Sequence, residues 1–97
     1  MEKLKRVEIV VDAVKAPELI EELERQGISG WSVIGGGTGS GSRGRRSGEE
    51  LTGVFENRYI LVACKPEQLD PLISVVRPIL ERFGGLCLVS DALSVLH

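Results

Sequence analysis

The sequence predicts an α+β fold in which two helices cover one face of a four-stranded antiparallel sheet. Two segments repeat apolar residues at helical spacing, and four shorter segments are rich in the β-branched and aromatic residues typical of strands. All connections between these segments except one are short, as they are in compact domains. The 97 residues suffice for a single domain, residues 1–97, with a modest core.

The first half of the chain predicts strand, helix, strand. A strand is expected over residues 3–12, because apolar residues alternate there at Val7, Ile9 and Val11. The helix that follows begins near Pro17, since proline suits a first helical turn, and ends at Gly27, a glycine placed to terminate it. A second strand is expected over residues 29–36.

The second half repeats this pattern in the order strand, helix, strand. The segment 55–64 predicts a third strand and the segment 86–95 predicts the last one. Between them, a helix within 66–83 keeps apolar residues on one face at Leu69, Leu72, Ile73, Val76, Ile79, Leu80 and Phe83. The complete order is the ferredoxin-like βαββαβ arrangement.

Two prolines complicate the second helix. Asp70 and Pro71 could form an N-cap and first-turn pair, which would leave residues 66–69 as a preceding turn. Pro78 lies inside the helix, where it removes one hydrogen bond and should produce a kink.

The one long connection has an unusual composition. Residues 35–48 comprise seven Gly, three Ser, one Thr and three Arg, which predicts a loop without a core of its own. Backbone amides in glycine-rich loops can converge on an anion, and arginine grips phosphate or carboxylate with two hydrogen bonds. Such a stretch also suits a plain flexible connector, so the composition alone leaves both interpretations open.

Composition narrows the function classes. The formal net charge of −2 and the isoelectric point of about 5.4 argue against a nucleic-acid-binding protein, since the positive charge is local to the loop. Neither a membrane-spanning run nor a signal-peptide pattern is present, which favours a cytoplasmic protein. Cys64 and Cys87 lie in apolar runs as small hydrophobic residues without metal-site spacing, and the only histidine, His97, is the last residue.

The predicted strands carry apolar residues on both faces of the sheet. Val10 stands beside Val11, Ile60 beside Leu61, and Cys87 beside Leu88. Two helices can cover only one of those faces, and the other would be a large exposed apolar patch. The sequence therefore predicts a homo-oligomer in which the sheets face inward.

The size, the element order, the loop position and the glycine pair before the last strand resemble the PII-like signalling proteins over nearly the whole chain. The run Gly41-Ser42-Arg43-Gly44-Arg45-Arg46 is similar to the Gly-Ser-Arg-x-x-Arg loop of SbtB proteins and of carboxysome-associated PII-like proteins. The shorter loop, the abrupt C-terminus and the glycine-rich context favour the carboxysome-associated group. The cysteine-bearing C-terminal extension of many SbtB proteins is missing, which argues against a redox-switched or nucleotide-hydrolysing role. The modifiable tyrosine of the conventional PII loop is also missing, which excludes control by uridylylation there.

The resemblance implies a homotrimer that binds adenine nucleotides in clefts between subunits. ADP and AMP are the expected ligands, with ATP or cAMP as further candidates, and in the carboxysome-associated group nucleotide binding is coupled to bicarbonate. Residues 35–54 would form the mobile T-loop, which reports energy and inorganic-carbon status to a partner such as a bicarbonate transporter or a carboxysome-related protein. The implied protein is a signalling regulator, not an enzyme, and has no catalytic cofactor.

The resemblance also assigns roles to residues. The residues expected to bind nucleotide are Gly35, Gly36, Gly37, Arg43, Arg46, Arg82, Gly84 and Gly85. The residues expected to contact bicarbonate are Thr38, Gly39, Ser40 and Gly41. Arg45 would face a protein partner.

Three other functions are less well supported. An amino-acid-sensing domain of the ACT type shares the fold but lacks a long cationic loop. An RNA-binding module of this topology needs exposed aromatic residues on its central strands, and the four aromatic residues here form no such motif. An enzyme would need more than the adjacent Glu49 and Glu50, which have no histidine or nucleophile beside them.

Overall fold

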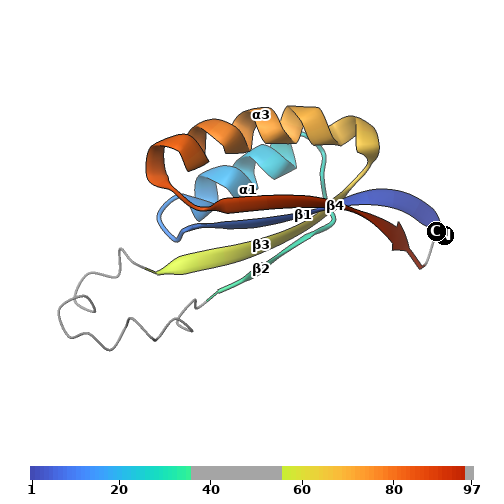
Figure 1. Cartoon of the computed structure of the whole chain (residues 1–97), viewed down its shortest axis with the longest axis horizontal. Coiled ribbons are helices and arrows are strands. Elements are labelled where there is room, and N and C mark those ends of the chain that lie inside the picture. Colours follow the sequence, from blue (N-terminus) through green and yellow to red (C-terminus); the bar gives the residue numbers. More distant parts are fainter. Residues whose placement is uncertain (36–55, 96–97) are drawn as a thin grey trace.

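The computed structural model describes residues 1–35 and 56–95. The elements follow one another as β1 (Glu2–Asp12), α1 (Ala16–Arg25), β2 (Trp31–Ile34), β3 (Asn57–Cys64), α3 (Pro66–Phe83) and β4 (Leu86–Ser94). The four strands form one antiparallel sheet in the order β2-β3-β1-β4, and both helices lie on the same face of it (Figure 1). The predicted ferredoxin-like βαββαβ fold is confirmed.

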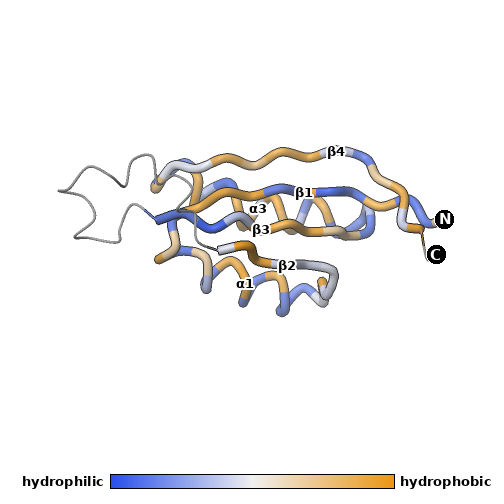
Figure 2. Tube along the Cα trace, turned by 90° about the horizontal axis from the view of Figure 1, so that it is seen from below, coloured by the Kyte–Doolittle hydropathy of each residue, from blue (hydrophilic) through white to orange (hydrophobic). Residues whose placement is uncertain are grey.

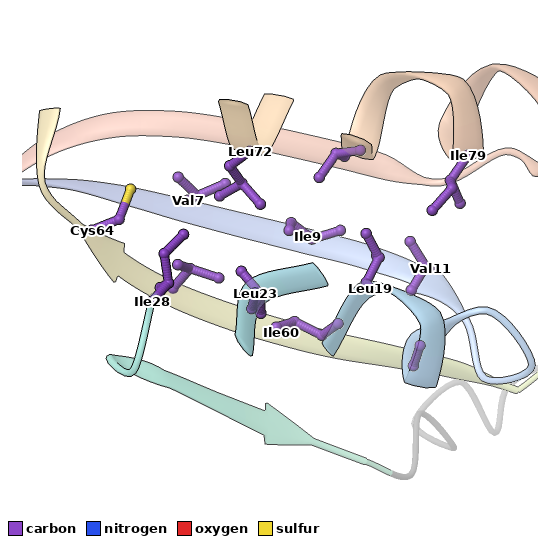
Figure 3. Close-up of a cluster of buried hydrophobic side chains, with 13 residues drawn as sticks. Val7, Ile9, Val11, Leu19, Leu23, Ile28, Ile60, Cys64, Leu72 and Ile79 are labelled. Carbon is purple, nitrogen blue, oxygen red and sulfur yellow. The ribbon is translucent and has the colours of Figure 1, made fainter. Parts of the chain in front are cut away.

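The core lies between the sheet and the two helices. On β1, Val7, Ile9 and Val11 point toward the helices and are fully or almost fully buried, as the alternation of the sequence predicts. The remaining core residues come from both helices, from β3 and from the turn before β2, and Figure 3 shows them converging: Ala16, Leu19, Leu23, Ile28, Ile60, Val62, Cys64, Leu72, Val76 and Ile79.

Helix α1 ends as the sequence predicts. Gly27 has φ +76°, a left-handed conformation that glycine adopts without strain. Its N–H donates to the carbonyl oxygen of Glu24 at 3.0 Å, and the N–H of Ile28 donates to that of Leu23 at 2.9 Å. This pair of bonds is the Schellman arrangement, and it turns Ile28 into the core.

Helix α3 begins at Pro66, so the alternative start at Asp70 is wrong. The N–H of Lys65 donates to Oε1 of Gln68 at 2.9 Å, and this contact caps the helix before Pro66. Pro71 therefore lies inside the helix, as Pro78 does. Each proline removes a hydrogen-bond donor, so burial of Leu72, Val76 and Ile79 must hold the helix in place.

Both cysteines are free thiols within the described part of the chain. Cys64 is buried in the core and Cys87 is half-buried against it. Burial raises the pKa of both thiols, which keeps them protonated and poorly reactive at neutral pH. Within residues 1–35 and 56–95, no helix is both long and apolar enough to cross a membrane.

The second face of the sheet, here called the open face, lies opposite the helices. Leu86 and Leu88 of β4 are 50% and 51% exposed there, which agrees with the prediction that this face is partly apolar. Tyr59 is a half-buried residue of the open face, because it alternates with the core residue Ile60.

A buried valine and an exposed valine test whether the described core stabilises the fold. Val7 is 0% exposed and Val14 is 67% exposed. We expect Val7→Ala to lower the free energy of unfolding by about 2 kcal/mol, because two buried methyl groups are lost and a cavity remains. Val14→Ala, the matched control, should change it by less than about 0.5 kcal/mol. Urea unfolding measures both, and equal losses would contradict the described core.

Candidate functional site

Four of the residues predicted to bind ligand lie in the described part of the chain: Gly35, Arg82, Gly84 and Gly85. The others lie outside the described residues: Gly36, Gly37, Thr38, Gly39, Ser40, Gly41, Arg43 and Arg46. Arg45, predicted to face a protein partner, also lies outside them. The described residues of the candidate site lie at one end of the sheet, the end at which β2 stops and β3 and β4 start (Figure 1).

Gly84 and Gly85 form the turn between α3 and β4. Their φ angles are +83° and +127°, both in the region that favours glycine. The N–H of Gly84 donates to the carbonyl oxygen of Leu80 at 2.8 Å and closes the helix. A Cβ atom built on Gly85 would lie 2.4 Å from the carbonyl oxygen of Val10, so the turn packs directly against β1. This close approach fixes where β4 starts.

Gly35 follows the last residue of β2, at the other edge of the sheet. A Cβ atom built on Gly35 would lie 3.5 Å from Cδ and Nε of Arg58, in ordinary van der Waals contact. The guanidinium of Arg58 also lies 3.7 Å from Oε1 of Glu56. The chain therefore leaves β2 beside a cationic side chain of β3.

One row of paired residues joins these two points across the sheet. Ile34 pairs with Tyr59, Tyr59 with Val10, and Val10 with Leu86. Gly35 and Gly85 are the next residues at the two ends of this row. Three strand spacings of about 4.8 Å place them about 14 Å apart, at opposite edges of one sheet. The two groups of predicted residues are therefore not brought together on one side of a single chain.

Two further cations lie beside the Gly84–Gly85 turn. Nζ of Lys15 lies 4.3 Å from the centre of the Phe83 ring, and Cζ of Arg82 lies 5.5 Å from it. Both distances are within the range of cation–π attraction. Lys15 was not predicted to belong to the site, because it precedes α1 and the periodicity of the sequence gives no sign that α1 and α3 bring it to Phe83. Phe83 itself is exposed and outside the core.

A groove of about 580 Å³ runs between α3 and β4. Its wall is lined by apolar side chains and by three charged ones, Asp70, Arg77 and Glu81. None of the four predicted ligand-binding residues that the structure describes lines this groove. Within residues 1–35 and 56–95 there is also no cluster of three or more side chains that could hold a metal ion.

The family is decided by a match over nearly the whole chain. The model of the family "Nitrogen regulatory protein P-II" matches residues 4–95. The chain belongs to the P-II family. This confirms the predicted resemblance to PII-like proteins, and the matched range includes nearly all of the strands and helices described above.

Solved structures of PII-like proteins share the fold. CPII from Thiomonas intermedia K12, solved with ADP and bicarbonate, is 27% identical with a TM-score of 0.73, over 93% of this chain and 86% of that one. The same protein bound to ADP, AMP and bicarbonate gives 26% identity and a TM-score of 0.74 over the same shares. A putative PII-like signalling protein from Thermus thermophilus is 23% identical with a TM-score of 0.77, over 98% of this chain and 92% of that one. No curated protein matches the sequence.

The two glycines of the turn should respond differently to substitution. Gly84→Ala meets open space and carries only the strain of a positive φ, which costs about 1–2 kcal/mol. Gly85→Ala adds a clash with the backbone of Val10 and should cost clearly more, on the order of 3 kcal/mol or above. Thermal unfolding compares the two variants. Equal stability of the two variants would show that the position of β4 does not depend on the close approach of Gly85 to β1.

Proposed function

We propose that this P-II family protein binds ADP or AMP together with bicarbonate in clefts between the subunits of a homotrimer, and that it acts as a signalling regulator and not as an enzyme. The observation that carries this proposal is the position of Gly35 and Gly85 at opposite edges of the sheet. The β2 edge of one subunit placed beside the β4 edge of the next would bring both groups of residues to one ligand. A cyclic arrangement satisfies this for every subunit at once.

The solved relatives support the choice of ligands. CPII, at 26–27% identity, has structures bound to ADP and bicarbonate and to ADP, AMP and bicarbonate. The described cations suit such ligands, because Arg58 lies beside Gly35 on one edge while Lys15 and Arg82 lie beside the Gly84–Gly85 turn on the other. A nucleotide between the two edges would then meet positive charge from both sides.

Within this site we assign each predicted residue a role. The run Gly35–Gly37 lets the backbone approach the nucleotide, and the phosphates are held by Arg43 and Arg46 from the same segment. The run Thr38–Gly41 offers hydroxyl and N–H donors to bicarbonate. Arg82, Gly84 and Gly85 meet the nucleotide from the neighbouring subunit.

Binding of two ligands should be coupled through the ordering of the loop. Fixing the backbone costs about 1–2 kcal/mol per residue, so ordering all of residues 35–48 would cost at most about 14–28 kcal/mol. A ligand of micromolar affinity supplies only about 8 kcal/mol. A nucleotide can therefore order part of the segment, bicarbonate can extend that order, and each ligand lowers the cost for the other.

The same coupling provides a signal. We propose that residues 35–54 act as the T-loop of this protein. Their ordering would determine whether a protein partner can contact Arg45. A bicarbonate transporter or a carboxysome-related protein is the kind of partner that would use a report on adenine nucleotides and inorganic carbon.

Calorimetry of ADP and AMP with and without saturating bicarbonate tests the ligands and their coupling. We expect the nucleotide to bind about tenfold more tightly with bicarbonate present, which corresponds to a coupling of about 1.4 kcal/mol. Chloride at the same ionic strength is the control for a general salt effect. Equal affinities would remove the carbon link, and no binding of any adenine nucleotide would overturn the proposed function.

Three arginine variants separate phosphate contacts from partner contacts. Arg43→Ala and Arg46→Ala should each weaken ADP by about tenfold or more and should leave adenosine, which has no phosphate, nearly unaffected. Arg45→Ala is the matched control from the same segment and should retain the affinity for ADP. A uniform loss in all three variants would indicate general electrostatic attraction without the assigned contacts.

A further inference from the structure

The connection between β1 and α1, residues 13–15, lies at the same end of the sheet as the Gly84–Gly85 turn (Figure 1). Figure 2, in which the sheet is seen from below, shows β1 as an inner strand between β4 and β3. The connection therefore leaves the sheet beside β4, the strand that begins directly after the turn. Lys15 carries the only charged side chain of this connection.

The backbone of the connection is held by hydrogen bonds to both neighbouring strands. The N–H of Val14 donates to Oδ1 of Asp12 at 2.8 Å, and the N–H of Lys15 donates to the carbonyl oxygen of Asp12 at 2.9 Å. The N–H of Ala13 donates to the carbonyl oxygen of Glu56, just before β3, at 3.0 Å. Because an aspartate side chain closes the turn, Lys15 starts from a fixed backbone position.

The side chain of Lys15 is held as well. Its Nζ lies 4.3 Å from the centre of the Phe83 ring and 3.5 Å from Oε1 of Glu18, and the side chain is only 28% exposed. A lysine that moves freely loses rotamer entropy when it contacts a ligand, whereas a lysine that is already held loses less. Lys15 is thus a preorganised cation beside Gly84, the residue that follows Phe83.

Phe83 brings a second cation to the same place. Cζ of Arg82 lies 5.5 Å from the centre of the ring, so both cations lie within cation–π distance of one aromatic side chain. The ring is exposed and outside the core, so burial does not account for its position. Two positive groups this close repel each other, and the negative face of the ring offsets the repulsion only in part. A polyanion that contacts both groups would relieve the repulsion and accept charge-assisted hydrogen bonds.

We propose that Lys15 is a further phosphate contact of the nucleotide site, that the Phe83 ring positions it, and that Glu18 competes with the nucleotide for it. The inference rests on the proposed binding of ADP or AMP and deepens it. Each added positive charge at the site favours the ligand with more negative charge. Lys15 therefore contributes more to the binding of ADP than to that of AMP, and nothing to that of adenosine.

Glu18 is suited to give way to a phosphate. Its side chain is 56% exposed, and it faces Lys15 as an i,i+3 ion pair on the surface. Exposed ion pairs of this kind are weak, because water screens them and both side chains lose freedom. A phosphate can replace the carboxylate as the oxygen partner of the ammonium at little cost, while Lys15 keeps its contact with the ring.

Calorimetry of the full chain with ADP, AMP and adenosine tests the phosphate contact. Lys15→Met keeps the apolar stem and removes the charge. We expect it to weaken ADP about tenfold, AMP by clearly less, and adenosine not at all. Lys3→Met is the matched control, since it removes the same charge near the start of β1, about 30 Å from Asp12 at the other end. Salt screens charges beyond about 8 Å, so this variant should bind ADP as the unaltered protein does.

The competing carboxylate gives a test with the opposite sign. Glu18→Gln frees Lys15 from its ion pair and should tighten ADP about twofold or more. Glu24→Gln removes the same charge from an exposed residue near the other end of α1 and should have no effect. In Lys15→Met, the gain from Glu18→Gln should shrink, because the carboxylate then has no ammonium to withhold.

Phe83 is tested as a positioning residue. Phe83→Leu keeps an apolar side chain without the ring and should weaken ADP while leaving adenosine unchanged. Combined with Lys15→Met, it should weaken ADP by less than the product of the two single effects, since both act on one ammonium. Phe83→Tyr retains the ring and should restore most of the affinity.

Several results would overturn the inference. These are an ADP affinity unchanged in Lys15→Met, equal losses for ADP and adenosine, or equal effects of Lys15→Met and Lys3→Met. Independent effects of Phe83→Leu and Lys15→Met would remove the positioning role of the ring. Failure here is distinguishable from failure of the proposed function. An unaltered protein that binds no adenine nucleotide loses both, whereas one that binds ADP without regard to Lys15 loses only this contact.

Discussion

Strand β1 is the constraint on which the rest of the structure depends. It is paired along most of its length with β3 on one side and β4 on the other. One set of its side chains forms the centre of the core, and the alternate set forms the centre of the open face. A shift of one residue in either pairing would exchange these two sets and would place Arg6 and Glu8 among the helices. The burial of Val7, Ile9 and Val11 therefore fixes the register of β1, and with it which side chains lie on each face of the sheet.

The width of the sheet governs the candidate site in a similar way. Gly35 and Gly85 are held at the two ends of one cross-strand row. The close contact of Gly85 with Val10 prevents Gly85 from moving along β1. In the proposed trimer a ligand that touches both glycines lies between chains, so assembly and ligand binding are coupled.

The sequence predicts the fold well because local periodicity and core burial agree. The alternation in β1 and the glycine at the end of α1 were sufficient to place those elements. The predicted range of α3 is confirmed, and only the alternative start at Asp70 is wrong, because the cap at Lys65 comes earlier and burial of the helix's apolar face outweighs the hydrogen bond lost at Pro71. Tyr59 and Lys15 could not be placed from sequence, since their partners Glu8 and Phe83 lie on other elements. The predicted contacts of residues 36–41, 43, 45 and 46 lie outside the described residues.

The antiparallel pairing of β2 with β3 has a consequence for how this protein could change over evolution. Ile34 pairs with Tyr59, and β3 begins at Asn57, so residues 35–56 connect two strands whose ends are held by the sheet. The entropic cost of closing a loop rises only with the logarithm of its length, by about 0.6 kcal/mol for each doubling. Insertions, deletions and substitutions there can accumulate with little effect on folding. New recognition specificities can therefore arise in this segment while the scaffold is left unchanged.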